Sequence, residues 1–538
     1  MELEAVDPVS VSRQGDGAGT AALSARAPLR QLLDVHPFGI ALAYLAAGTM
    51  LTLAFAPLGG WALAPVLVFP VLTLCLYSQP RRAALYGFWF GFGLFLFGTY
   101  WVYISIHEFG QAPVWLAVAL TLGLVTVMAL YYALTAWLIA RLARGRPARL
   151  LLAAPAAWAA VEWLRGWLLT GFPWLTLGYS QVDSPLAGWL PVVGVYGVSF
   201  LVVLSTAAFV TALALTGRAR RNAIVVAVLP WVLGLALGGL EWVRPAGSPL
   251  TATIVQGGIP QELKWRPERF QETLEVYGRS LVSHADSDLV VWPEVAIPAA
   301  AEDVDWYLEL LEGQLRHAGQ SLVLGIQERE NDRYYNSVLL LDGQRRQFYR
   351  KRHLVPFGEY FPVPESVRQW MRMRSLPSYD MAPGAPEQPL LELPDATRLA
   401  VMICYEDAYG AEQLYALPDA ELLVNVSNDA WFGDSIAPHQ HLEIARTRAL
   451  ETGRYMIRAT NNGISAFIDP RGGLAQTAAQ FEYATLTMPV RPMSGITPYA
   501  RMGNWPAVVV ALALVAWLAW RPGALAARKA APGLRRRP

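Results

Sequence analysis

Eight long apolar stretches constrain this chain more than any other feature of its sequence. A helix that crosses a bilayer needs about 20 predominantly apolar residues. Only 16% of the 538 residues are charged, against about 25% in typical soluble domains. The sequence therefore predicts a polytopic α-helical membrane domain with eight transmembrane helices. The predicted spans are Pro37–Pro57, Leu58–Gln79, Ala83–Ile106, Pro113–Ala140, Leu150–Leu169, Leu186–Thr216, Asn222–Leu240 and Trp505–Trp520.

The fifth predicted span is interrupted by two charges, Glu162 and Arg165. A charge at the centre of a bilayer costs roughly 2.5–3.5 kcal/mol on insertion scales. We therefore expect these two side chains to lie near a membrane interface or to face the interior of the helix bundle.

Positive charge in the connections predicts the orientation of the helices. Basic clusters follow the second, fourth, sixth and eighth spans, whereas alternate connections such as His107–Gly110 are poor in Lys and Arg. Because such clusters stay on the cytoplasmic side, both termini are expected in the cytoplasm. The resulting divisions are a disordered cytoplasmic tail at 1–35, transmembrane helices 1–7 at 36–244, an extracytoplasmic domain at 245–503, transmembrane helix 8 at 504–521 and a basic cytoplasmic tail at 522–538.

The block at 245–503 alternates short apolar runs with charged, helix-like stretches, which is typical of an α/β domain. Its length is sufficient for a core of its own. The predicted strands are Thr251–Val255, Leu289–Trp292, Leu322–Ile326, Ser337–Leu341, Leu399–Ile403, Leu422–Val426 and Ser465–Ile468. The predicted helices are Pro267–His284, Asp305–His317 and His441–Glu451.

The connection after the fifth span contains the segment Thr170–Leu175, which is rich in Gly, Pro and aromatic residues. It is expected on the outer side of the membrane. A loop in an aromatic belt and a role at the substrate are both open interpretations.

A candidate nucleophile, Cys404, stands at the end of the predicted buried strand Leu399–Ile403. The thiolate is the attacking form of cysteine, and the end of a strand is a fixed point. A buried structural thiol is the alternative, since free Cys is among the most buried residue types. The other cysteine, Cys75, lies inside an apolar run and is interpreted as packing, so no disulfide framework is expected.

Two further reactive groups follow predicted strands. Glu294 comes after Trp292 and Pro293, and Lys351 lies in a basic stretch that ends at Glu359. A carboxylate that takes the thiol proton, and an ammonium that stabilises the thiolate and then an oxyanion, would complete a site for acyl transfer through a thioester. Taken alone, Lys351 could belong to a solvated basic loop, Glu294 could be a surface carboxylate after a strand, and Glu359 could be a simple loop acid.

These three stretches resemble the Glu-Lys-Cys triad of the nitrilase (carbon–nitrogen hydrolase) superfamily. The position of the domain between the seventh and eighth spans is similar to that in the apolipoprotein N-acyltransferase family. Further matching stretches are Gln256–Gln261, Lys264-Trp265, Val424–Gly433 and Gly171–Trp174. The resemblance covers nearly the whole chain after residue 36.

The resemblance implies a nitrilase-like αββα sandwich resting on the membrane domain. In this reading Glu294 is the general base, Lys351 stabilises the oxyanion and Cys404 is the nucleophile. Glu359, Tyr405 and Glu406 would support the site, and Trp265 would lie in a loop near the acyl-chain entrance.

The resemblance also implies the substrates. A phospholipid, typically phosphatidylethanolamine, would donate its sn-1 acyl group. The α-amine of the S-diacylglyceryl-cysteine at the N-terminus of an apolipoprotein would accept it. The expected location is the bacterial inner membrane with the catalytic domain in the periplasm. No cofactor and no nucleic acid are expected, and the protein is expected to be a monomer.

Two other classes of function remain as alternatives. A membrane-tethered amidase would use the same triad with water as the second nucleophile. A transporter or receptor is less consistent with the spans, which carry few of the charges that mark transport pathways.

Two further stretches of the sequence allow smaller predictions. The stretch Val367–Arg374 mixes Trp and Met with three arginines, and is interpreted either as a lipid-contacting element or as a solvated amphipathic helix. His439 and His441 lack a third ligand at useful spacing, so no metal site is expected.

Overall fold

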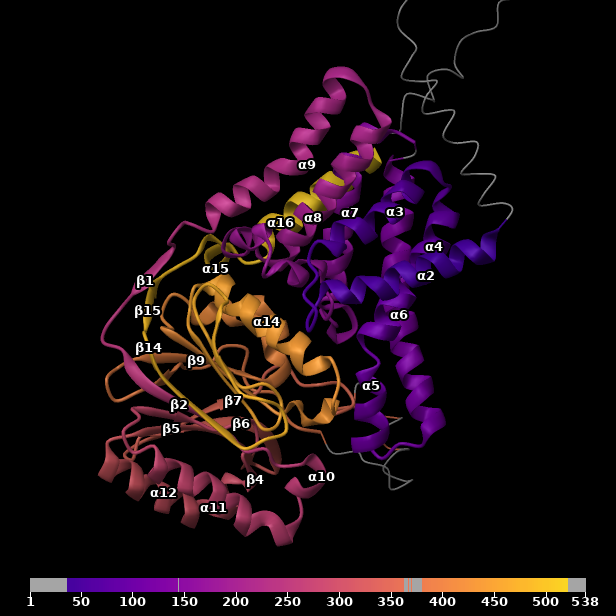
Figure 1. Ribbon diagram of the computed structural model, residues 1–538. Coiled ribbons are helices and arrows are strands. Elements are labelled where there is room, and N and C mark those ends of the chain that lie inside the picture. The colour runs from indigo at the N-terminus through magenta and orange to yellow at the C-terminus, as the bar shows by residue number, and fades with distance from the viewer. Residues whose placement is uncertain (1–35, 144, 362–365, 367–368, 370–379, 521–538) are drawn as a thin grey trace, which may run out of the picture.

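The computed structural model describes residues 36–143, 145–361, 366, 369 and 380–520. A bundle of helices forms one part, and a layered α/β sandwich lies against it (Figure 1). Of the stretch predicted to contact lipid, residues 367–368 and 370–374 lie outside the described residues.

Each of the eight predicted spans coincides with a helix. The helices are α2 (Pro37–Leu51), α3 (Leu63–Tyr77), α4 (Pro80–Gly98), α6 (Val114–Ala143), α7 (Pro147–Arg165), α8 (Leu190–Ala214), α9 (Gly217–Leu237) and α16 (Trp505–Trp520). After α4 the chain bends by 51° into the short helix α5 (Trp101–Ile104) and a π-helical turn that ends at Phe109.

The number of membrane spans, eight, stays a prediction. Among the described residues, four helical stretches are long and apolar enough to cross a membrane, or five if the bent pair beginning at Pro80 is one span. Helices α3 and α16 are apolar but shorter. Helix α7 carries the charges Glu162 and Arg165, which the structure buries inside the protein.

Glycines allow helices α2 and α4 to approach closely. A Cβ atom on Gly48 would lie 1.8 Å from the carbonyl oxygen of Phe90, and one on Gly93 would lie 2.1 Å from that of Leu45. Small residues at such crossings are typical of helix pairs in membranes. The sequence of α4 thus fixes which of its faces meets α2.

The sandwich contains two principal sheets. One runs in the order β14 (Ala484–Val490), β2 (Leu250–Gln256), β3 (Leu289–Val291), β5 (Ser321–Glu330), β6 (Arg333–Leu341) and β7 (Arg346–Arg350), with β4 (Ile297–Ala300) also paired to β5. The other runs β13 (Leu474–Thr477), β12 (Ala466–Ile468), β11 (Met456–Thr460), β10 (Leu422–Ser427), β9 (Arg398–Ile403) and β8 (Leu391–Glu392). A separate pair joins β1 (Val243–Pro245) to β15 (Met493–Gly495).

The apolar side chains define four layers in the sandwich. Residues such as Ile254, Val401 and Phe467 fill the core between the sheets. Helices α11 (Pro267–Ser283) and α12 (Asp305–Ala318) cover the outer face of the first sheet. Helix α14 (Ala437–Thr452) covers the second sheet, so the predicted αββα order is present.

Helix α14 also makes several of the polar contacts between the sandwich and the bundle. Gln440 accepts a hydrogen bond from Trp174 Nε1 at 2.6 Å, and Glu443 accepts one from the backbone N–H of Ala56 at 3.2 Å. One helix therefore packs on a sheet with one face and on the membrane domain with another, as Figure 1 shows.

Removing the ring of Phe467 should destabilise the sandwich. Its side chain is fully buried between the sheets, and Phe→Ala changes in such cores cost about 3–5 kcal/mol. We expect Phe467→Ala to lower the unfolding temperature of the purified protein clearly. Phe481→Ala is the control, because Phe481 is 45% exposed; equal shifts in both variants would contradict this account of the core.

Candidate active site

Cys404 begins the 3₁₀ turn Cys404–Ala408 directly after strand β9. Its backbone φ is +53°, a left-handed conformation that is uncommon for a residue other than glycine. Strained residues of this kind concentrate at functional sites. The neighbouring parallel strand β10 brings Asn425 beside the turn, and its Nδ2 donates to the carbonyl oxygen of Cys404 at 3.3 Å. The position of the thiol is therefore determined by the sheet and the turn together.

Glu294 lies in the turn that follows β3 and is buried. Strand β5 passes directly beneath this turn at Gly325, where a Cβ atom would lie 2.5 Å from the Cα of Glu294. The next residue, Val295, has a positive φ of 46°. Only a glycine in β5 leaves room for the carboxylate to be held this close to the sheet.

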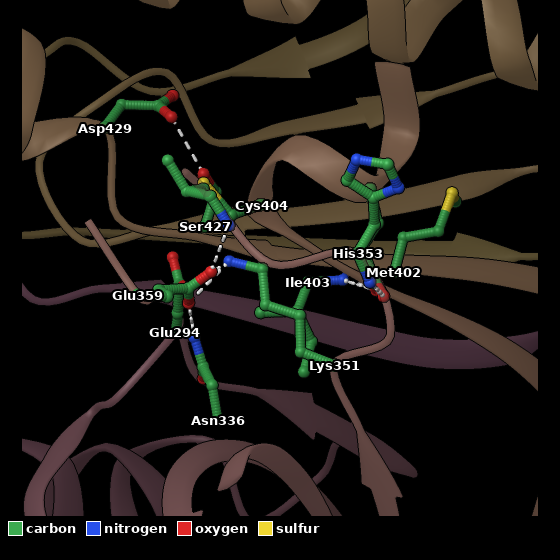
Figure 2. A network of polar contacts seen from close by, with 12 residues as sticks. Glu294, Asn336, Lys351, His353, Glu359, Met402, Ile403, Cys404, Ser427 and Asp429 are labelled. Carbon is green, nitrogen blue, oxygen red and sulfur yellow. Dashed lines mark hydrogen bonds and ion pairs between the residues drawn. The ribbon is translucent and has the colours of Figure 1, made fainter. Parts of the chain in front are cut away.

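Lys351 follows strand β7 and is 1% exposed. Its ammonium lies 2.9 Å from Glu359 Oε1 and 3.4 Å from Glu294 Oε1. Figure 2 shows these two carboxylates and the ammonium grouped beside Cys404. The structure thus brings together the three residues of the predicted triad, and places Glu359 nearer to the lysine than Glu294.

Asn336 on strand β6 is a site residue that the sequence did not indicate. Its Nδ2 donates to Glu294 Oε1 at 2.7 Å and to Glu359 Oε1 at 2.8 Å. The backbone carbonyl oxygen of Asn336 accepts a hydrogen bond from the backbone N–H of Lys351 at 2.8 Å. One side chain therefore orients both carboxylates, and nothing in a lone Asn within a strand would have revealed this.

Burial and the nearby charges together favour the protonated form of the Cys404 thiol. Burial raises its pKa and the charge of Glu294 raises it further, while Lys351 lowers it. Burial alone would lower the pKa of Lys351, but Glu359, Glu294 and Cys404 together raise it. At neutral pH the site therefore contains a neutral thiol beside a charged ammonium, so a base has to take the thiol proton when a thioester forms.

Glu406 connects the cysteine turn to the lysine loop. Its carboxylate accepts backbone N–H groups from Ile403 at 2.7 Å, Arg352 at 2.7 Å and His353 at 3.2 Å. The hydroxyl of Tyr349 also donates to it. Because the carboxylate is fully buried, its pKa is raised, although the N–H groups of Ile403 and Arg352 partly offset the effect of burial. Its contacts are those of a positioning residue.

Tyr405 points away from the sandwich and towards the membrane domain. Its ring stacks on Trp174 with centroids 6.2 Å apart, and its hydroxyl lies 2.8 Å from that of Tyr409. Trp174 belongs to the segment whose role the sequence left open. That segment now lies against the residue that follows Cys404.

The predicted substrate-side residue, Trp265, is 50% exposed at the end of the short helix α10 (Gln261–Lys264). Its neighbour Lys264 is buried, and the Lys264 ammonium donates to the carbonyl oxygen of Glu294 at 3.0 Å. Burial lowers the pKa of Lys264 to about 8. The loop that bears the exposed tryptophan is thus attached to the turn of Glu294.

A buried ionic network lies behind the cysteine turn. His441 contacts Asp429 through Nδ1 at 2.8 Å and Asp407 through Nε2 at 3.0 Å. The guanidinium of Arg458 bridges the same two carboxylates. Burial and Arg458 lower the pKa of His441, but Asp407 and Asp429 raise it to a net value of about 9. His441 is therefore a charged structural residue.

No group of three or more His, Cys, Asp or Glu residues within the described parts of the chain has a geometry that could hold a metal ion. The histidines 439 and 441 are instead engaged by Gln480 and by the ionic network.

Comparison with known proteins places the chain in a family. Residues 47–208 match the family described as the apolipoprotein N-acyltransferase N-terminal domain, and residues 251–497 match the carbon–nitrogen hydrolase family. An apolipoprotein N-acyltransferase of Azotobacter vinelandii is 45% identical over 91% of this chain and 96% of its own length. The chain belongs to the apolipoprotein N-acyltransferase family.

A second relative and a solved structure extend the comparison. The apolipoprotein N-acyltransferase of Methylococcus capsulatus is 42% identical over 88% of this chain and 94% of its own length. A cysteine-to-alanine mutant of Nesterenkonia AN1 amidase from the nitrilase superfamily is 19% identical, with a TM-score of 0.35 over 46% of this chain and 92% of that one. The sequence relatives show that the protein is an acyltransferase with a carbon–nitrogen hydrolase domain, and that the resemblance drawn from its motifs was right.

Replacing Glu294 should affect two reactions of Cys404 in opposite directions. The negative charge of Glu294 raises the pKa of the thiol, so Glu294→Gln should increase the thiolate fraction and accelerate alkylation by iodoacetamide at pH 8. Formation of an acyl-enzyme, which needs a base, should slow by about 10²–10⁴. Intact-mass kinetics measure both rates. The exposed Glu309→Gln is the control, and a parallel loss of both rates would contradict the assigned roles.

The ionic network predicts a pH-dependent stability. Since the pKa of folded His441 lies at about 9, above its ordinary value near 6.5, the stabilisation is complete below about pH 6.5 and is lost as the pH rises through about 9. His441→Gln should therefore lower the unfolding temperature strongly at pH 6 and much less at pH 10. His439→Gln, on the same helix, should not show this convergence; equal effects of His441→Gln at both pH values would contradict it.

Proposed function

We propose that this protein transfers a fatty acyl group from a membrane phospholipid to the N-terminal α-amine of S-diacylglyceryl-cysteine in apolipoproteins, through a thioester on Cys404. The observation that carries the proposal is the position of the Lys351 ammonium. It lies between Glu294 and Glu359, and its charge lowers the pKa of the Cys404 thiol. Membership of the apolipoprotein N-acyltransferase family supports it.

The first half-reaction forms the thioester. Glu294 takes the proton of the Cys404 thiol while the sulfur attacks the ester carbonyl of the donor, for which we propose the sn-1 position of phosphatidylethanolamine. The oxyanion of the tetrahedral intermediate is stabilised by the Lys351 ammonium. When the C–O bond breaks, Glu294 returns its proton to the alkoxide, and a lysophospholipid leaves.

The second half-reaction forms the amide. The α-amine of the acceptor attacks the thioester carbonyl, and Glu294 receives a proton from the nitrogen. The C–S bond then breaks and the proton returns to the sulfur, which restores the thiol. Both steps use the same base and the same oxyanion partner, so the site needs no cofactor.

The attachment of the sandwich to apolar helices fits substrates that stay in a bilayer. Exposing an acyl chain to water costs about 0.8 kcal/mol per methylene. A thiol held beside the membrane domain avoids that cost at each turnover. A small amide needs no such helices, so the amidase alternative is less well supported.

For the topology we propose eight spans, with the catalytic domain at 245–503 on the periplasmic face of the bacterial inner membrane. The basic clusters where α3 meets α4, α6 meets α7 and α8 meets α9 support this orientation. Both ends of the helical domain then face the cytoplasm. Since Glu294, Lys351 and Cys404 all come from one chain, we propose that the monomer is active.

Mass spectrometry of the intact protein tests the proposal. Incubation with phosphatidylethanolamine alone should add one fatty-acyl mass to Cys404, because the thioester forms before the acceptor binds. A diacylglyceryl lipopeptide should then discharge the adduct and appear with a third acyl chain. Cys404→Ala should form no adduct.

Two outcomes would contradict the proposal. Discharge of the adduct by water at the same rate with and without lipopeptide would indicate a hydrolase. Transfer by Cys404→Ala would require another nucleophile, and Cys75→Ala is the matched control that should retain full activity because Cys75 is buried in helix α3.

A further inference from the structure

The loop between α7 and the helical turn at Leu177 has a strained backbone. We call residues 168–176 the strained loop. Leu169, Thr170 and Leu175 have φ values of 56°, 73° and 55°. Residues other than glycine rarely adopt this conformation, and it persists only where surrounding contacts hold it.

One buried arginine of the membrane domain holds most of the strained loop. Arg165 is 1% exposed. Its Nη1 donates to the carbonyl oxygens of Phe172 at 2.7 Å and Trp174 at 2.6 Å, and its Nη2 donates to Thr176 Oγ1 at 3.2 Å. The planar guanidinium suits several acceptors at fixed angles, which an ammonium does not. Removing it would release the loop at three points.

A carboxylate one turn earlier in α7 fixes the residue that follows the loop. Glu162 Oε1 accepts the backbone N–H of Leu177 at 2.9 Å and the indole N–H of Trp158 at 3.0 Å. Charges inside a membrane domain are expensive and usually serve a function. Here Glu162 and Arg165 both point into the bundle and bind the same connection.

The opposite side of the strained loop contacts the turn of Cys404. The hydroxyl of Tyr409 lies 3.0 Å from the carbonyl oxygen of Gly171 and that of Tyr405 lies 3.5 Å from it. The ring of Trp174 stacks on Tyr405. Because Tyr405 directly follows Cys404, the loop touches the turn whose backbone sets the direction of the thiol.

We infer that Arg165 is a positioning residue for Cys404. It holds the strained loop, and the loop holds Tyr405 and Tyr409 so that the thiol keeps its orientation towards Glu294 and Lys351. The membrane domain then does more than anchor the sandwich, since it completes the geometry of the nucleophile. The acylation test of this inference rests on the proposed function, whereas the test by alkylation of the Cys404 thiol does not.

The test uses full-length protein in vesicles of phosphatidylethanolamine and phosphatidylglycerol. Arg165→Met should lower the rate of acyl-Cys404 formation by about tenfold to a hundredfold, because a misplacement near 1 Å has effects of this size. Arg165→Lys should lower it less. The loss should fall on kcat, with KM for the lipid unchanged. Arg446→Met is the matched control, since Arg446 pairs with Asp183 across the same domain interface without touching the loop.

Alkylation of Cys404 by iodoacetamide supplies a readout that needs no acyl donor. Peptide mapping separates Cys404 from Cys75, and Arg165→Met should change the alkylation rate while Arg446→Met leaves it unchanged. If the native protein forms no acyl-enzyme, the proposed function fails, and the alkylation rates still decide the role of Arg165. Native rates of both reactions in folded Arg165→Met, or equal losses in Arg446→Met, would overturn the inference.

A second variant acts from the other side of the loop. Tyr409→Phe keeps the ring but removes the hydroxyl that meets Gly171, and it should also lower the acylation rate. If both residues act through the loop, combining it with Arg165→Lys should give a smaller loss than the product of the two single losses. A loss equal to that product would overturn the inference. If Arg165→Met does not fold, a native rate in Tyr409→Phe would overturn it as well.

Discussion

A buried ammonium beside a thiol is the interaction on which the site depends. Lys351 is almost fully shielded from water, so its charge persists only because Glu359 and Glu294 lie within 3.4 Å of it. Asn336 orients both carboxylates, and Glu406 ties the lysine loop to the cysteine turn. The sandwich is the scaffold that brings these strand ends together. Removing both carboxylates would leave the Lys351 ammonium buried without a counter-charge.

The same logic extends across the boundary between the domains. Helix α14 places Glu443 and Glu451 against backbone N–H groups of the bundle, at Ala56 and Val195. From the other side, Arg165 holds the loop that meets Tyr405. Buried polar groups of one domain, such as the carboxylates of Glu443 and Glu451, thus find their hydrogen-bond partners in the other domain. The two domains are therefore one structural unit around the nucleophile.

Much of the fold was predictable because its signals are local. Apolar length located the eight long helices that the described residues form in the bundle, and short apolar runs located strands such as β9 and β10. Strand β11 escaped because Arg458 interrupts its apolar pattern; the partners that neutralise this arginine, Asp407 and Asp429, are distant in sequence. The number of complete spans was harder to fix, since α7 carries charges that only the packed bundle accommodates.

The sequence by itself determined the apolar helices, the alternation of the α/β domain and the identity of Glu294, Lys351 and Cys404 as candidates, because each depends on a short stretch of residues and its resemblance to known motifs. Only the tertiary structure decided how they are held. The amide of Asn336, which reaches Glu294, and the hydroxyls of Tyr405 and Tyr409, which reach Gly171, join segments far apart in the chain. The contact of Lys351 with Glu359 and the hold of Arg165 on its loop are closer in sequence, but they depend on how each loop folds back. Hydrogen bonds of this kind depend on distances that a linear pattern does not contain.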